Sequence, residues 1–121
     1  MRLLLLATIL IPLPAQSQDF YCRNEAAEIR CVSNSCEVER ESFTPMELRR
    51  TGDRLSICAY SGCWGGRIAM WRTRGGVTFL SATVRSEAPA QPSSGSLSVM
   101  FDHEGTAQVR WLGFSNAMTC G

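Results

Sequence analysis

Six cysteines constrain the fold of this chain more than any other feature of its sequence. They are Cys22, Cys31, Cys36, Cys58, Cys63 and Cys120. All of them follow an N-terminal stretch in which Arg2 precedes an apolar run from Leu3 to Leu13, and small residues that signal peptidase accepts come after that run. The sequence therefore predicts a signal peptide over residues 1–17 and disulfides formed in an oxidising compartment.

Residues 18–121 are enough for one domain and too few for two, so we expect a single disulfide-stabilised domain. Each disulfide is expected to stabilise it by about 2–4 kcal/mol. Cys58 and Cys63 enclose only residues 59–62, a loop that can reverse the chain and bring the two sulfurs together, so they are the expected pair. Sequence alone does not select the pairing of the other four cysteines; a bond from Cys120 to one of the three early cysteines would tie the termini together and leave the other two to pair locally.

The charge balance argues against several partners. The net charge is +1, so no global field favours nucleic acid or an anionic membrane. Cys22 lies too far beyond the signal to be the lipidated cysteine of a lipoprotein, and we expect no membrane anchor after signal cleavage. The expected location is the periplasm of a Gram-negative bacterium or the medium outside it.

Alternating apolar and polar residues predict antiparallel hairpins. Segments 67–71 and 77–84 flank a turn at 72–76, where two glycines permit the positive φ angles of a tight reversal. Segments 97–101 and 107–112 alternate in the same way around a short polar turn. The sequence therefore predicts two hairpins in the second half of the chain.

The first half is less regular. Segments 54–60 and 37–43 are also expected to be strands, the second with Val38 facing inward. Segment 44–50 could form a single helical turn, because a threonine cap is followed by proline and then by glutamate, or it could belong to an irregular connection. A second short helix is conceivable at 25–30.

These elements together predict the fold class. The stretch 86–95 is expected to be a loop, because prolines and small polar residues oppose regular structure. Short strands separated by turns favour an all-β domain, either a small antiparallel barrel or a sandwich, with one or two short helical turns.

The residues that could carry catalysis have simpler interpretations. His103 is the only histidine, and its neighbours have the composition of a turn, so we interpret it as solvated rather than catalytic. Glu37, Glu39 and Glu41 are interpreted as a solvent-facing row rather than the converging carboxylates of a glycosidase. The cysteines lack metal-site and redox spacings. We therefore expect a non-enzymatic protein with no cofactor and no metal.

Two groups of residues are candidates for binding a partner. The first lies at the predicted hairpin tip and comprises Tyr60, Ser61, Gly62 and Trp64. Trp64 is expected to be the exposed tryptophan, whereas Trp71 and Trp111 are expected in the core. The second group is Arg72 and Arg74, which share a strand face and carry the guanidinium forks that bind carboxylates and phosphates.

The arginine group has an alternative interpretation. Arg49, Arg50 or Arg54 could extend it into an anion-binding patch for an acidic partner. Equally, these side chains could be ordinary outward arginines that pair with the acidic N-terminal third of the chain.

The segment 58–66 and the cysteine arrangement resemble a group of small exported proteobacterial proteins of no known function. A second resemblance is to the periplasmic inhibitors of c-type lysozyme. Their tyrosine-cysteine start, Ser-Gly loop, tryptophan and basic-Gly pair match Tyr21-Cys22, Ser61-Gly62, Trp71 and Arg74-Gly75 in order.

The lysozyme-inhibitor resemblance implies a small eight-stranded barrel with a loop at Ser61-Gly62 that reaches the lysozyme active site. The chain departs from the family at Cys63, which follows the Ser-Gly pair directly. It departs again where glycines replace the family's tyrosine. Both departures change the loop that the resemblance makes functional.

We therefore expect an exported binding or inhibitor module that acts on an envelope or secreted protein. The alternative is a small-ligand-binding barrel, which requires a cavity that aromatic side chains leave unfilled. The aromatic residues expected inside are Trp71, Phe79, Phe101 and Trp111. A hydrolase is the least expected function.

Overall fold

The computed structural model describes residues 19–60, 62–88, 90 and 92–121, and these residues form ten strands. The strands are β1 (Phe20–Arg23), β2 (Glu28–Val32), β3 (Ser35–Glu39), β4 (Met46–Thr51), β5 (Arg54–Ala59), β6 (Gly62–Arg74), β7 (Val77–Ser86), β8 (Ser94–Asp102), β9 (Thr106–Trp111) and β10 (Phe114–Cys120). The predicted signal peptide lies outside the described residues. A helix long and apolar enough to cross a membrane is absent from the part of the chain that is described.

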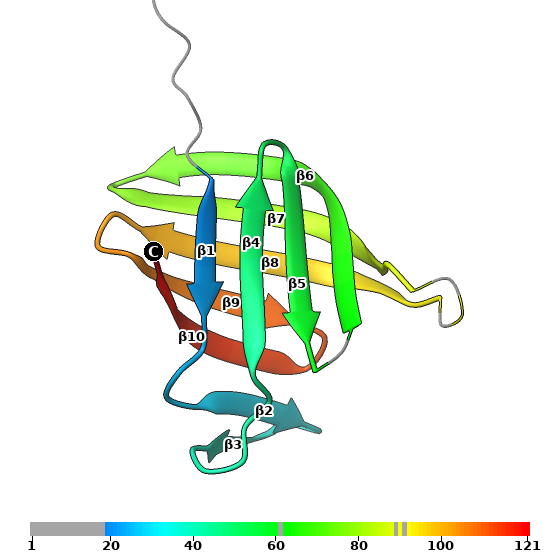
Figure 1. The fold of residues 1–121 in the computed structure, drawn as a ribbon. Coiled ribbons are helices and arrows are strands. Elements are labelled where there is room, and N and C mark those ends of the chain that lie inside the picture. Colours follow the sequence, from blue (N-terminus) through cyan, green and yellow to red (C-terminus); the bar gives the residue numbers. More distant parts are fainter. Residues whose placement is uncertain (1–18, 61, 89, 91) are drawn as a thin grey trace, which may run out of the picture.

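Eight of the strands in the described chain close into an antiparallel barrel (Figure 1). Its order is β1-β4-β5-β6-β7-β8-β9-β10, and β10 pairs back with β1. The other two strands form the β2–β3 hairpin, which lies below the barrel in Figure 1 and joins it at Phe114 and Ser115 of β10. The predicted all-β class is confirmed, and the architecture is the barrel rather than the sandwich.

Side chains fill the barrel interior because inward residues alternate with outward ones along each strand. On β7, for example, Leu80, Ala82 and Val84 are buried, whereas the residues between them face outward. Large buried side chains from other strands are Met46, Leu48, Leu55, Ile57, Leu97, Val99, Val109, Trp111 and Met118. At the end of the barrel near the N-terminus, Phe20 stacks on Phe101 with ring centroids 4.9 Å apart.

Two of the four aromatic residues expected inside are not enclosed. Phe79 points outward from β7, and Trp71 is 42 % exposed on the part of β6 that extends past β5. Phe101 and Trp111 do pack on the core. The interior is therefore filled mainly by aliphatic side chains.

Each disulfide joins two residues that lie directly opposite each other on neighbouring strands. The bonds are Cys22–Cys120 between β1 and β10, Cys31–Cys36 between β2 and β3, and Cys58–Cys63 between β5 and β6. Their Cα atoms are 4.0 to 4.1 Å apart, the short spacing typical of pairs that exchange no backbone hydrogen bonds. Three disulfides in a chain of this size are consistent with an oxidising, extracytoplasmic environment.

Neither segment 44–50 nor segment 25–30 forms the helical turn that was considered for it. Segment 44–50 contains the start of β4, in which Met46, Leu48 and Arg50 are buried and the residues between them are exposed. This period of two is a strand pattern. Segment 25–30 likewise leads into β2 rather than forming a helix.

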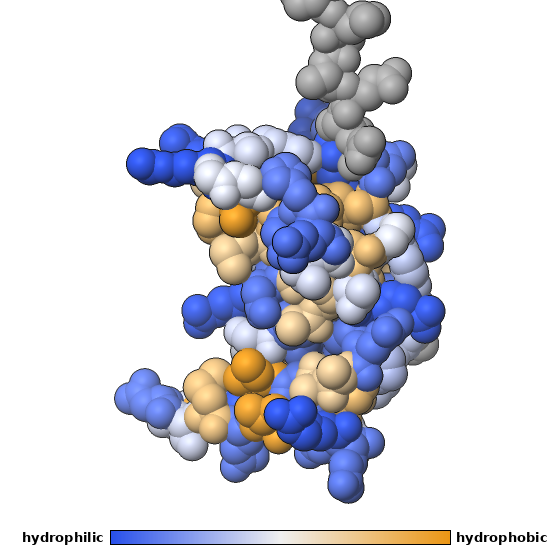
Figure 2. All heavy atoms as spheres, turned by 90° about the vertical axis from the view of Figure 1, so that its left-hand side faces the viewer, coloured by the Kyte–Doolittle hydropathy of each residue, from blue (hydrophilic) through white to orange (hydrophobic). Residues whose placement is uncertain are grey.

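The β2–β3 hairpin also changes the prediction for Val38. Because the hairpin lies outside the barrel, Val38 is exposed rather than inward. Ile29 and Val32 are exposed beside it. Figure 2 shows hydrophobic surface at the lower end of the molecule, the end that carries the hairpin in Figure 1.

Strand β6 is longer than predicted and bends along its length. A bulge interrupts its register with β7 between Ile68 and Met70. Its pairing with β5 ends at Arg67, so residues 68–74 continue past β5 and pair only with β7. We call this segment the arm; it ends at the predicted turn, where Gly75 and Gly76 have φ angles of +59° and +78°.

We expect the Cys22–Cys120 bond to stabilise the protein more than the Cys31–Cys36 bond. The sequence separations are 98 and 5, and loop-closure entropy gives about 5 and about 2 kcal/mol for such loops. The measurement is urea unfolding of the two double-alanine variants. Equal losses of stability in the two variants would contradict the prediction.

Candidate functional site

The turn between β5 and β6 carries most of the first candidate group. We call Cys58, Tyr60, Gly62, Cys63 and Trp64 the braced tip, because the Cys58–Cys63 bond closes its base. Ser61 lies outside the described residues. Tyr60 has a φ of +53° and its side chain is 84 % exposed. The tip therefore presents an aromatic residue on a covalently closed turn.

A buried polar network holds the Tyr60 side chain in place. Its hydroxyl lies 3.0 Å from Oγ1 of Thr44. The backbone N–H of Thr44 donates to the Glu28 carboxylate at 3.1 Å, and its carbonyl accepts from the Asn24 amide at 2.9 Å. Glu28, Thr44 and Asn24 are all buried, so the Tyr60 hydroxyl is tied to a fixed part of the barrel end.

The charge of Glu28 is compensated within this network. Arg30 donates to its carboxylate at 3.0 Å, and the Arg30 guanidinium also lies 5.4 Å from the centroid of the Phe114 ring. The sequence analysis did not select Glu28, Thr44 or Asn24. They come from three separate segments, and only their burial together at the barrel end reveals them.

Trp64 is not the exposed tryptophan, contrary to the prediction. It is partly buried against the core, with its ring centroid 4.7 Å from that of Trp111. Its indole N–H donates to Oγ of Ser93 at 2.8 Å. Trp64 therefore supports the braced tip from inside the barrel rather than offering a surface to a partner.

Arg72 and Arg74 lie at the other end of β6. Both point outward from the arm, and they share a face as predicted. Arg72 lies ten positions beyond Gly62 along β6, which corresponds to at most about 33 Å of extended chain. The two candidate groups thus do not form one surface.

The other arginines have local contacts that differ from one another. Arg67 forms an exposed ion pair with Asp53 at 3.2 Å. Arg49 lies over the ring of Tyr21, 5.3 Å from its centroid. The pKa of Tyr21 is raised, chiefly because its hydroxyl donates a hydrogen bond to the Glu47 carboxylate.

Arg50 is buried beneath the arm. Its guanidinium lies 4.0 Å from the centroid of the Trp71 ring, and its Nε donates to the Gly52 carbonyl at 3.1 Å. Burial lowers the pKa of Arg50, and the nearby charge of Asp19 opposes that shift. Arg50 therefore packs against Trp71 of the arm and, being buried, does not extend the exposed Arg72 and Arg74 surface.

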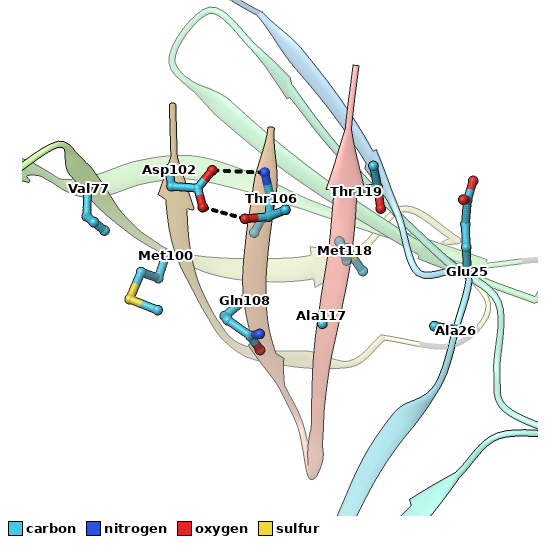
Figure 3. A pocket seen from close by; sticks show the side chains of 11 residues that line it. Glu25, Ala26, Val77, Met100, Asp102, Thr106, Gln108, Ala117, Met118 and Thr119 are labelled. Atoms are coloured by element: carbon cyan, nitrogen blue, oxygen red, sulfur yellow. Dashed lines mark hydrogen bonds between the residues drawn. The ribbon is translucent and has the colours of Figure 1, made fainter. Parts of the chain in front are cut away.

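The outer face of the barrel has two shallow depressions of about 400 Å³ each. The first crosses β8, β9 and β10 (Figure 3). Met100, Gln108 and Ala117 line it, and Asp102 and Thr106 stand at one end. The second extends toward β6 and shares Met100 and Gln108 with the first, so the two are continuous.

The turn that carries His103 is held by Asp102. The Asp102 carboxylate accepts from the backbone N–H of Glu104 at 2.9 Å and of Thr106 at 3.0 Å, and from the Thr106 hydroxyl. These bonds, with the hydroxyl bond first, lower the pKa of Asp102. His103 is exposed in this turn, as its interpretation as a turn residue requires.

The three glutamates of the predicted row are exposed, except that Glu39 is partly buried. The Glu39 carboxylate accepts from the backbone N–H groups of Glu41 and Ser42, which lowers its pKa. Within the described ranges, no group of three or more His, Cys, Asp or Glu side chains could hold a metal ion. No protein-family model, curated protein or solved structure matches the chain.

We expect Gly62→Ala to destabilise the braced tip. A β-carbon at this position would lie 3.0 Å from Cη2 of Trp64, so the indole must shift against Trp111. The expected cost is about 1–2 kcal/mol by urea unfolding. In a Trp64→Ala background the cost should disappear; a cost that persists there would show that the ring contact is not its cause.

We expect Asp102 to make stability depend on acid pH. Its folded-state pKa lies below the ordinary 3.8, so its contribution is complete above that value and is lost as pH falls through the folded pKa. Asp102→Asn should therefore cost more stability at about pH 6 than at about pH 2. A penalty of the same size at both pH values in urea unfolding would contradict this assignment.

Proposed function

We propose that this chain is an exported, non-enzymatic binding module that presses its braced tip against a protein partner in the periplasm or the medium. The observation that carries the proposal is Tyr60, a large aromatic side chain that is 84 % exposed yet anchored through its hydroxyl to Thr44. Aromatic residues of this kind are common anchors in protein interfaces. An exposed tyrosine held in one orientation serves recognition better than it serves stability.

The second support is preorganisation. A partner that binds a mobile loop must offset the entropy lost when the loop becomes ordered. Here the Cys58–Cys63 bond closes the base of the turn, and Trp64 packs beneath it. The braced tip therefore loses little freedom on binding, which suits an inhibitor.

The resemblance to periplasmic inhibitors of c-type lysozyme makes a c-type lysozyme the first partner to test. That resemblance implies an eight-stranded barrel whose Ser-Gly loop enters the enzyme cleft. An eight-stranded barrel with Gly62 in the braced tip agrees with this implication. Arg74 and Gly75, the other matching pair, lie at the far end of β6, so in this proposal they take no part in the same contact.

The alternative function, binding of a small ligand inside the barrel, is less well supported. The interior of the barrel is occupied by buried side chains from its strands. The two depressions described above lie on the outer face. Any small ligand would have to bind there instead of inside.

The test is inhibition of a c-type lysozyme by the oxidised protein, followed as the rate at which a bacterial cell-wall suspension clears. Tyr60→Ala should weaken inhibition by about 30-fold or more, because a central aromatic anchor is lost. Tyr60→Phe, which removes only the hydroxyl that meets Thr44, should weaken it by about 3- to 10-fold.

The matched control is Tyr21→Ala, since Tyr21 is the only other tyrosine and lies on the outer side of β1. This variant should inhibit as the unaltered protein does. Full inhibition by Tyr60→Ala with an unchanged unfolding temperature would overturn the role of the tip. Absence of inhibition by the unaltered protein would overturn lysozyme as the partner.

A further inference from the structure

The outer face of β6 to β10 is unusually basic for a chain whose net charge is close to zero. Within the described parts of these five strands the only acid is Asp102. The arginines are Arg67, Arg72, Arg74, Arg85 and Arg110. Asp102 is itself engaged by Thr106 at the end of β8. This face therefore favours an anionic ligand.

A groove with a floor of small residues crosses the same face. Ser81, Ser98 and Ser115 lie on one cross-strand row, which also contains Arg110 between the last two serines. The groove is the second depression, which also exposes larger side chains that rise beside the serines. These are Met70, Phe79 and Met100, which are 39 %, 41 % and 41 % exposed.

The register explains why these side chains gather. Met70 lies opposite Ser81, and Phe79 lies opposite Met100 on the neighbouring strand. Three large apolar side chains from three consecutive strands thus border a line of serines. A volume of about 400 Å³ falls in the range of small-molecule sites, and methionines adapt their shape to a flexible chain.

Charged residues determine where an anionic group would bind in the groove. Arg110 lines the second depression, and no ion pair or side-chain hydrogen bond joins it to another described residue. In the first depression, which is continuous with the groove, the acidic residues Asp102 and Glu25 are among the lining residues (Figure 3). An anionic head group is therefore attracted to Arg110 and repelled from the Asp102 end.

We propose that this groove binds a free single-chain anionic amphiphile, of the fatty-acid class. Its carboxylate pairs with the Arg110 guanidinium, which can donate a hydrogen bond to each of the two oxygens. Its alkyl chain lies over Ser81 and Ser98, between Met70 and Met100, and covers the exposed Phe79. This site is separate from the braced tip and does not depend on the function proposed for the tip.

The test uses dodecanoate below its micelle concentration and isothermal titration calorimetry with the mature, oxidised protein. Dodecanoate should bind, whereas dodecyltrimethylammonium, with the same chain and the opposite charge, should bind at least about tenfold more weakly. Arg110→Gln should weaken dodecanoate binding by about tenfold or more, and Arg110→Lys should restore part of the loss.

Ser98→Trp should abolish binding, because an indole on the exposed floor fills the groove. Thr83→Trp is the matched control, since Thr83 is exposed on the same outer face and lines neither depression. Arg85→Gln is the control for charge. Both controls should bind dodecanoate normally, and the unfolding temperature of every variant shows that the barrel is intact.

Three results would overturn the proposal. The first is that the unaltered protein fails to bind dodecanoate. The second is equal affinity for the cationic amphiphile, or affinity for dodecanoate that Ser98→Trp and Arg110→Gln leave unchanged. The third is binding to phosphatidylglycerol vesicles that is as strong in Ser98→Trp as in the unaltered protein, which would make this face a membrane-docking surface.

Discussion

The pairing of β1 with β10 is the contact on which the barrel depends. Without it, β1 and β10 would each leave a free edge of the sheet. This seam is narrow, because β1 has four residues and meets β10 at only two register positions. The Cys22–Cys120 bond lies at one of them and is buried at the Cys22 side. A covalent bond therefore secures the place where backbone hydrogen bonding is weakest.

Much of the fold could be predicted from the sequence where period and turn chemistry agree. The hairpins around Gly75 and around the Asp102 turn are examples. Segment 44–50 misled because its Thr-Pro start resembles a helix cap. The buried residues of β4 are Met46, Leu48 and Arg50. An arginine is not expected at a buried strand position, so the alternation of apolar and polar residues is not visible in the sequence. Arg50 is buried because Trp71, on the arm of β6, packs over it.

The candidate site was less predictable, because it depends on which strands meet. Trp64 packs inward because it lies opposite the buried Ile57 on β5, and sequence alone does not show that register. The anchor of Tyr60 on Thr44 arises only when β4 and β5 pair. The serine-floored groove is lined by residues from five strands, so it exists only when all five are in register. No short sequence motif indicates it.

The seam has a mechanical consequence. The backbone N–H of Gly121 donates to the Tyr21 carbonyl at 2.9 Å, so the two ends of the barrel chain lie side by side next to the Cys22–Cys120 bond. A pulling force applied through these ends would load a covalent sulfur–sulfur bond before any strand could peel from its neighbour. The barrel would therefore resist extension as long as the Cys22–Cys120 bond is intact. After reduction of that bond, the same force would separate β1 from β10 first.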